Sequence, residues 1–192
     1  MKNIRMKLLA ASLVLGAVSP AAFASDGTIT FTGRITGQTC TITGNGAAAD
    51  FTVPLPTVGT GTLNADGNTA GRTPFNIQLS ACNPNTGNVA VFFESGANAD
   101  MATGRLRNAA VNVPAEGDNP AVNAATNVQV GVLNADLTPV AIGNAYAAQN
   151  SQSVALAAGA ATLQYYAQYV ATGGAATAGP ITTTTQYSIV YP

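Results

Sequence analysis

Histidine is absent from this sequence, and lysine occurs only at Lys2 and Lys7. Without histidine, a Ser-His-Asp or Cys-His nucleophile system and a histidine-containing zinc site are excluded. Without a lysine further along the chain, a P-loop has no side chain that reaches the phosphates. We therefore expect a protein that is not an enzyme, with no cofactor, no catalytic residue and no metal site.

Charge is also scarce, at 8% of the sequence. The chain after residue 24 has four arginines against eight acidic residues, which gives it a formal net charge of −4. Nucleic-acid binding draws its affinity from clustered lysine and arginine that release counterions, so no nucleic-acid partner is expected. Glu116 and Asp118 in PAEGDNP are close enough to bind calcium together, but their glycine and proline neighbours favour a solvated loop.

No apolar run is long enough to span a membrane. Leu8–Val18 is shorter than the ~20 residues that a spanning helix needs. Basic residues precede this run, and the small-x-small pattern Ala-Phe-Ala ends at Ala24. We interpret residues 1–24 as a secretory signal peptide, and expect no stable membrane insertion after its cleavage.

The sequence contains two cysteines, Cys40 and Cys82. An exported chain meets oxidising conditions in which two thiols pair, so we predict a disulfide between them. Two free thiols are the alternative.

Alternation of apolar and polar residues recurs along the chain, and helical spacing does not. It is typical of half-buried strands. The segments that show it are Phe75/Ile77/Leu79/Ala81, Val128/Val130/Val132, Leu163/Tyr165/Ala167/Tyr169 and the odd positions of 181–191. Val89–Phe93 is a denser apolar run, as expected of a strand buried on both faces. Turn-rich stretches separate these segments, so we predict one all-β domain.

The two ends of the chain are less easily explained. An apolar strand at a terminus invites pairing unless the chain itself or another protein covers it. The final stretch QYSIVYP is such a strand. A second alternating segment lies directly behind the signal peptide, with Gly27, Ile29, Phe31, Gly33 and Ile35 on one side. Spacing alone also allows this segment to be an ordinary first strand of a sandwich.

Four stretches, in this order, resemble pilins of the chaperone–usher (type 1-like) fimbrial family: ITFTGRITGQTCTI, IQLSAC, YYAQYVATGGAATAG and QYSIVYP. Gly179 is fourteenth from the C-terminus and Tyr191 is penultimate, which matches the family's C-terminal assembly signature. The threonines of ITTTT, at 181–185, depart from it, because they are less apolar than the wall of a hydrophobic groove usually is.

The resemblance implies an incomplete immunoglobulin-like sandwich that lacks its final strand and is completed by donor-strand complementation. Residues 25–37 would be the donor-strand extension, and residues 38–192 the pilin domain. The implied donor residues are Gly27, Ile29, Phe31, Gly33 and Ile35. The implied groove and chaperone residues are Gly179, Tyr187, Ile189, Tyr191 and Pro192. The implied partners are a periplasmic pilus chaperone, an outer-membrane usher and neighbouring pilin subunits.

The function that follows is that of a structural shaft subunit of an adhesive fimbrium on a Gram-negative cell, exported through the periplasm and polymerised head to tail. The alternative is a minor or tip subunit that binds a host receptor. Dedicated two-domain adhesins of the family carry an extra lectin domain and lack the extension, whereas this chain has the extension and no spare length. A capping or terminator subunit, which would accept no further donor, is a third interpretation.

Overall fold

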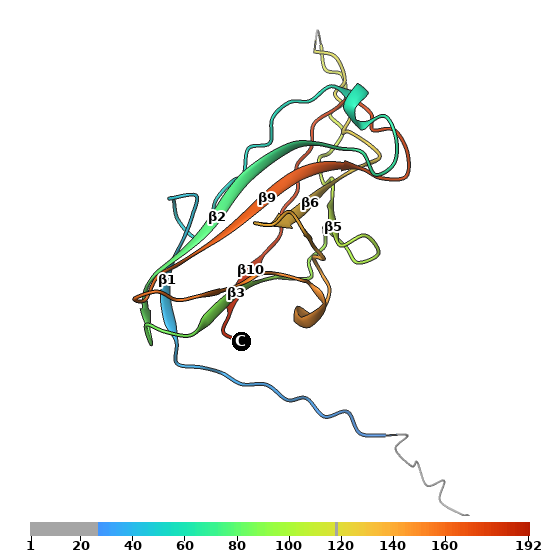
Figure 1. Ribbon diagram of the computed structural model, residues 1–192. Helices are drawn as coiled ribbons and strands as arrows, with labels where there is room; N and C mark the ends of the chain where they lie inside the picture. Colours follow the sequence, from blue (N-terminus) through green and yellow to red (C-terminus); the bar gives the residue numbers. More distant parts are fainter. Residues whose placement is uncertain (1–26, 118) are drawn as a thin grey trace, which may run out of the picture. The chain divides into compact units, whose positions relative to one another are not determined.

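The structure is a computed structural model that describes residues 27–117 and 119–192. The predicted signal peptide, residues 1–24, lies outside the described residues. The chain divides into two units, Met1–Ile35 and Thr36–Pro192. In the first unit, residues 27–35 form neither helix nor strand. In the second unit the strands form two antiparallel sheets, so the all-β prediction is confirmed (Figure 1).

The larger sheet contains seven strands in the order β1-β2-β9-β6-β5-β4, with β7 paired to β6. Its long strands are β2 and β9, which pair over most of their length. Their alternating sequences place large side chains in register. Phe75 faces Tyr165, and Ile77 faces Leu163. The strands are β1 (Thr39–Gly44), β2 (Thr69–Asn83), β4 (Ala99–Asp100), β5 (Arg105–Arg107), β6 (Val128–Asn134), β7 (Pro139–Val140) and β9 (Ala161–Ala171).

The smaller sheet has three strands in the order β10-β3-β8. They are β3 (Asn88–Phe93), β8 (Ser153–Ala155) and β10 (Tyr187–Val190). The described helices are two short 3-10 turns, η1 (Thr60–Leu63) and η2 (Tyr146–Ala148). No helix in the part of the chain that the structure describes is long and apolar enough to cross a membrane.

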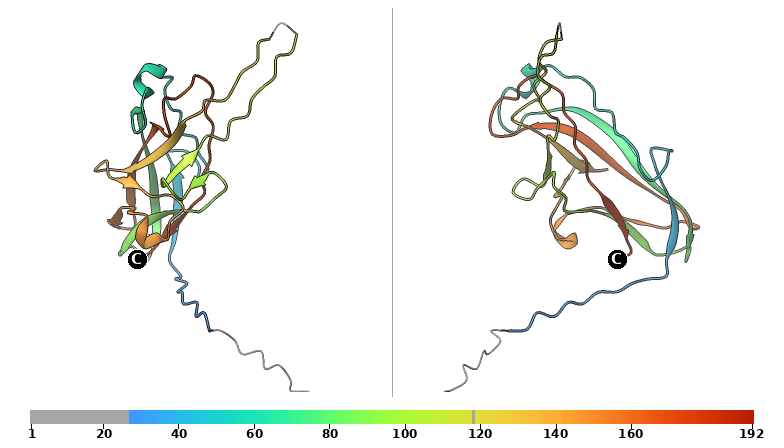
Figure 2. Two further views of the ribbon diagram at one scale, coloured as in Figure 1. Left: turned by 90° about the vertical axis from the view of Figure 1, so that its right-hand side faces the viewer. Right: turned by 180° about the vertical axis from the view of Figure 1, so that it is seen from behind.

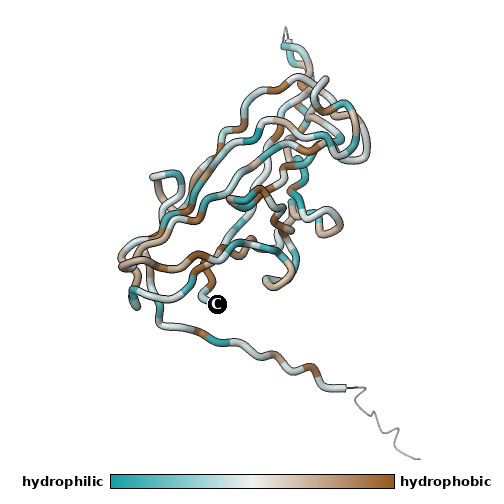
Figure 3. The backbone as a smooth tube through the Cα atoms, in the orientation of Figure 1, coloured by the Kyte–Doolittle hydropathy of each residue, from teal (hydrophilic) through white to brown (hydrophobic). Residues whose placement is uncertain are grey.

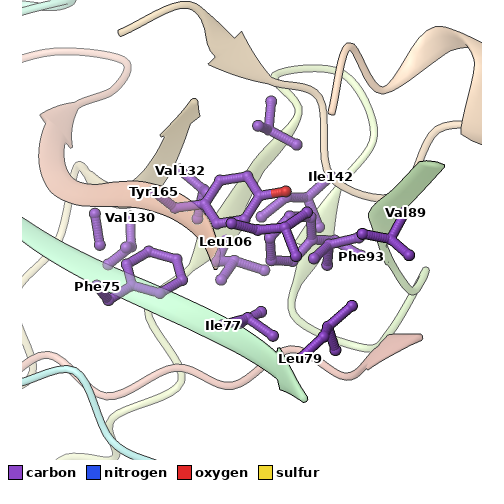
Figure 4. Packing of buried hydrophobic residues seen from close by; sticks show 14 of the residues in the cluster. Phe75, Ile77, Leu79, Val89, Phe93, Leu106, Val130, Val132, Ile142 and Tyr165 are labelled. Carbon is purple, nitrogen blue, oxygen red and sulfur yellow. The ribbon is translucent and has the colours of Figure 1, made fainter. Parts of the chain in front are cut away.

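The core fills the space between the two sheets (Figure 4). Tyr165 of β9 is its largest fully buried side chain. The Tyr165 ring stacks on Phe75 at 5.6 Å between centroids and meets Phe93 of the smaller sheet edge-on at 5.4 Å. Burial raises the pKa of Tyr165. Hydrophobic positions alternate with hydrophilic ones along the long strands, as the period-2 patterns predict (Figure 3).

Two strands are buried on both faces. In β3, the side chains of Val89, Val91 and Phe93 are buried, and Ala90 on the opposite face is buried as well. The prediction for the run Val89–Phe93 is therefore confirmed. In β6, which lies between β9 and β5 within the larger sheet, all seven residues are buried.

The predicted alternation along β2 is wrong at its end. Ala81 is exposed and has a φ of 50°. The register between β1 and β2 shifts there, since Thr41 pairs with Ser80 but Thr39 pairs with Asn83. Such a bulge places an extra residue in one strand and changes which side chains point inward. Cys82 is buried as a result, and it is bonded to Cys40, so the predicted disulfide is confirmed.

Candidate functional site

An apolar groove of about 1290 Å³ lies beside the last strand. One wall is residues 181–191, and the other is residues 49–55, which follow β1. The two walls come from opposite ends of the chain and run in opposite directions along the domain (Figure 1). The floor of the groove is formed by side chains of β2, β5, β6 and β9, among them Phe75, Leu106, Val130, Val132 and Ala167.

The C-terminal wall shows the predicted alternation. The odd-numbered residues from Ile181 to Tyr191 are partly buried, and the even-numbered ones up to Ser188 are exposed. Thr183 and Thr185 take part in this pattern, and the Thr183 hydroxyl oxygen is buried without a hydrogen-bond partner among the described residues. A buried unpaired hydroxyl costs about 1–3 kcal/mol. The threonines therefore make this stretch of the wall less stabilising than an apolar one.

The expectation of one strand over residues 181–191 is only partly right, because the regular strand β10 covers only Tyr187–Val190. Tyr187 pairs with Phe93 and Ile189 with Val91 of β3. Before Tyr187, the wall has single backbone bonds instead, from Glu94 N–H to Gln186 O (2.8 Å) and from Ala109 N–H to Thr182 O (2.7 Å). The ladder stops because the neighbouring chain, after β3 ends, turns away into β4 and β5.

The groove-facing edge of β10 is open. Within residues 27–117 and 119–192, β10 pairs with β3 alone. Its other edge therefore presents a row of backbone N–H and C=O groups without strand partners. Such an edge is a template for pairing with a further strand.

Sequence reasoning missed the second wall. Phe51, Val53 and Leu55 pack against the core from one side of this segment. Gly44 of β1 makes room for it, because a Cβ there would collide with the Phe51 ring. The alternation of Phe51, Val53 and Leu55 in the stretch FTVPL is a sequence signal from which an extended segment with one apolar face could have been predicted. Pro54 has no backbone N–H, so it interrupts the row of N–H donors along this segment, as is common on a sheet edge.

Tyr187 connects the two walls. Its hydroxyl donates a hydrogen bond to the Ala49 carbonyl oxygen at 2.8 Å, and its ring meets Phe51 edge-on at 6.4 Å between centroids. Burial, together with the nearby Asp50 charge, raises the pKa of Tyr187. The phenol therefore stays neutral and keeps its donor proton at physiological pH.

Of the other predicted groove residues, two line the groove and two do not. Ile189 and Tyr191 line the groove, and the Tyr191 hydroxyl lies 3.8 Å from the Cys40 sulfur. Pro192 is exposed. Gly179 does not line the groove but a smaller pocket next to it. A Cβ on Gly179 would collide with the Asn123 carbonyl oxygen and would lie 2.5 Å from Ala125 N, so this position requires glycine for close backbone packing.

The predicted donor residues belong to the unit that ends at Ile35, and the groove residues belong to Thr36–Pro192. The apolar donor side chains are highly exposed, at 79% for Ile29, 90% for Phe31 and 100% for Ile35. A Cβ added to Gly27 or Gly33 would meet no heavy atom within 4 Å. This segment thus carries an alternating apolar pattern that its own fold does not bury.

The described residues contain no group of three or more histidine, cysteine, aspartate or glutamate side chains that could hold a metal ion. The chemistry of the groove is that of a backbone edge above an apolar floor. It suits an extended peptide with apolar side chains at every second position.

Comparison with known proteins places this chain in a family. The family model for type-1 fimbrial protein A (FimA) matches residues 55–192. The chain is 47% identical over 182 residues to the major fimbrial subunit SMF-1 of Stenotrophomonas maltophilia, covering 93% of this chain and 99% of that protein. It is 42% identical over 184 residues to the F17 fimbrial protein of Escherichia coli, covering 93% and 94%.

The fold is also similar to that of a solved structure. A chain from a solved structure of a chaperone–usher pilus superposes with a TM-score of 0.54 at 17% identity, covering 91% of this chain and all of that one. This match supports the immunoglobulin-like sandwich that the resemblance implied. Family model and relatives together show that this chain belongs to the type-1 fimbrial protein family and is a fimbrial subunit.

Proposed function

We propose that this chain is the shaft subunit of a surface fimbrium, and that residues 27–35 of one copy fill the groove of the next by donor-strand exchange. The observation that carries the proposal is the open edge of β10 above an apolar groove, in a chain that also has an unburied alternating apolar segment. The segment supplies what the groove lacks: backbone partners for β10 and apolar side chains for the floor.

The donor segment and the C-terminal wall of the groove have similar lengths. Residues 27–35 extend over roughly 30 Å at ~3.3 Å per residue, and the wall of residues 181–191 over roughly 36 Å. Ile29, Phe31 and Ile35 would point to the floor together with Gly27 and Gly33, since alternate side chains share a face. Burying the Phe31 ring contributes about 1.5–3 kcal/mol.

The same chain is donor at one end and acceptor at the other. A contact between two different surfaces of identical subunits joins them head to tail, and it yields a filament when the rotation between copies does not close a ring. In this proposal the product is an open head-to-tail homopolymer on the cell surface. Relatives named as major fimbrial subunits support a shaft role over a tip role.

Before assembly the open edge needs a temporary partner, because an exposed apolar edge strand promotes aggregation. In this proposal residues 1–24 direct export and are removed, and residues 25–37 serve as the donor-strand extension of the pilin domain 38–192. A periplasmic chaperone covers the groove and holds Tyr187, Ile189, Tyr191 and Pro192. At the outer-membrane usher, the extension of the next subunit replaces the chaperone.

The proposal is tested with a synthetic peptide of residues 27–37 added to the mature chain. Hydrogen exchange should slow at the two walls, in residues 49–55 and 187–191, because the peptide pairs with the β10 edge and covers the groove. A peptide with Phe31→Asp is the matched control and should give little protection. Protection that is equal for both peptides, or that is absent from the walls, would contradict the proposal.

A further inference from the structure

A long excursion of the chain connects β5 to β6. We call residues 109–117 and 119–124 the arm. Its two sides pair through Val113 and Val122, which exchange backbone hydrogen bonds of 2.8 and 2.9 Å, and through Glu116 and Asn119. The arm projects from the two sheets (Figure 2).

The arm exposes apolar side chains on one of its faces. Val111 is 75% exposed, Val113 54% and Val122 45%. Val113 and Val122 are directly opposite one another, and Val111 shares their face because side chains two residues apart in extended chain point the same way. Elsewhere in Thr36–Pro192 the exposed large apolar side chains of the described residues are scattered singly, at Met101, Leu137 and Tyr146. A gathered set such as the valines is typical of an interaction surface.

The base of the arm is fixed to one end of the groove. On one side, Ala109 N–H donates to Thr182 O at 2.7 Å. On the other side, Ala125 N–H donates to Pro180 O at 3.1 Å, and the Asn108 side chain joins both sides through bonds to the Ala125 and Pro180 carbonyl oxygens. The arm therefore begins where the C-terminal wall begins, at the Ile181 end.

The direction of the donor segment decides what lies at this end. Immunoglobulin-like sandwiches are built from antiparallel sheets, so a strand that completes the edge of β10 runs antiparallel to it. Residue 27 then lies toward Tyr191, and Ile35 lies toward Ile181. The segment is nearly as long as the wall, so Ile35 comes close to the base of the arm.

The folded part of the donor copy follows immediately. Its β1 begins at Thr39, four residues after Ile35, which is at most about 14 Å of extended chain. In that copy β1 is held by its pairing with β2 and by the disulfide of Cys40, and the Gln38 side chain donates to Pro84 O at 3.3 Å. The end of the donor domain that carries Gln38 and Pro84 must therefore lie next to the arm.

We propose that the valine face of the arm docks on the folded domain of the donor copy, at the end that carries Gln38 and Pro84. This inference rests on the proposed donor-strand exchange. It adds a second contact between the same two copies, outside the groove. The extension then supplies the link, and the arm fixes the orientation of one domain on the next.

The test separates the two contacts by using the extension peptide and the whole subunit in parallel. The variant Val111→Ser, Val113→Ser, Val122→Ser changes exposed side chains only, and Met101→Ser, Leu137→Ser is the matched control. We expect the triple variant to bind the peptide of residues 27–37 as the wild type does, since the peptide lacks a folded domain. We expect its polymerisation from whole subunits to slow roughly tenfold or more, because apolar contact is lost.

A photo-crosslinker at Val113 locates the contact. The expected product joins Val113 of one copy to the region of Gln38 and Pro84 of the adjacent copy. Polymerisation of the triple variant at the wild-type rate would overturn the inference. So would an equal loss of peptide binding, which would make the arm part of the groove wall. If the wild-type chain does not bind the peptide at all, donor-strand exchange itself is wrong, and the inference falls with it.

Discussion

The Tyr187 hydroxyl reaches across the groove and donates a hydrogen bond to the Ala49 carbonyl oxygen at 2.8 Å. This bond joins the C-terminal wall to the wall that follows β1. We expect a strand that enters between the walls to displace it.

Tyr187→Phe removes the bond and keeps the ring against Phe51. A hydrogen bond of this kind contributes about 0.5–1.5 kcal/mol, so we expect the extension peptide to associate roughly twofold to tenfold faster with the variant. Stopped-flow fluorescence with a labelled peptide measures the rate. Association that is unchanged or slower would show that the bond does not hold the groove closed.

Cys40 and Cys82 are bonded across 42 residues. In the chain-entropy model, a loop of this length stabilises the fold by about 4 kcal/mol. The double variant Cys40→Ser, Cys82→Ser should lose stability of this order in urea unfolding. Mass measurement after alkylation of the unreduced exported protein should find no labelled thiol, and two labelled thiols would refute the pairing in the cell.

Gly179 packs against the backbone of residues 123–125 at the base of the arm. Gly179→Ala places a methyl group where the Asn123 carbonyl oxygen lies, and we expect a loss of about 1–3 kcal/mol or more from such overpacking. Gly174→Ala is a suitable control, because its φ of 142° resembles the 155° of Gly179, but the nearest heavy atom to an added Cβ is Asn127 Nδ2 at an ordinary contact distance of 3.6 Å. Equal destabilisation by both substitutions would mean that Gly179 is required for its backbone conformation and not for its close contact with residues 123–125.

Asp100 holds β4 and β5 beside β6. Gln129 donates to its carboxylate at 2.8 Å, and this bond, helped by the Ala102 N–H and the Arg107 charge, lowers the pKa of Asp100. A carboxyl group whose pKa is lowered by folding stabilises the protein above its unfolded pKa, near 4, and loses that effect as pH falls through the folded pKa. The stability difference between wild type and Asp100→Asn should therefore shrink in acid. Urea unfolding at pH 7 and at pH 3 measures it, and a difference that is the same at both would contradict the assignment.

Much of the fold could be predicted from local patterns. The alternation of Phe75, Ile77 and Leu79 specified the core face of β2, and the dense run Val89–Phe93 specified a strand buried on both sides. The bulge at Ala81 could not be predicted, because it depends on how β1 pairs with β2 far along the chain. The short ladder of β10 depends likewise on the path of the chain after β3.

Only one of the two walls of the groove was predicted from the sequence. The odd spacing of Tyr187, Ile189 and Tyr191 predicted that they share one face, and the family resemblance implied that this face borders a groove; all three line the groove. The opposite wall was not predicted, although Phe51, Val53 and Leu55 alternate, because nothing in that stretch indicates which sheet edge it lies beside. Gly179 is required by a close approach to Ala125, a contact that only the three-dimensional structure brings together. The arm and its exposed valines were likewise recognised only as a turn at PAEGDNP.

In the proposed assembly, residues 27–35 act as a donor strand in the groove of another copy. Gly33→Leu adds volume on the face directed at the groove floor, which a packed site resists by ~1–3 kcal/mol or more. Thr32→Leu is the matched control, since its side chain lies on the opposite face of the extended segment.

The most direct measurement is incorporation of both variants into surface filaments, in cells without the wild-type copy, together with the yield of the periplasmic chaperone complex. We expect both variants to form the chaperone complex normally. Thr32→Leu should build filaments, and Gly33→Leu should build none or build them markedly more slowly. Normal filaments from Gly33→Leu, or a collapse of its chaperone complex, would contradict the donor-strand account.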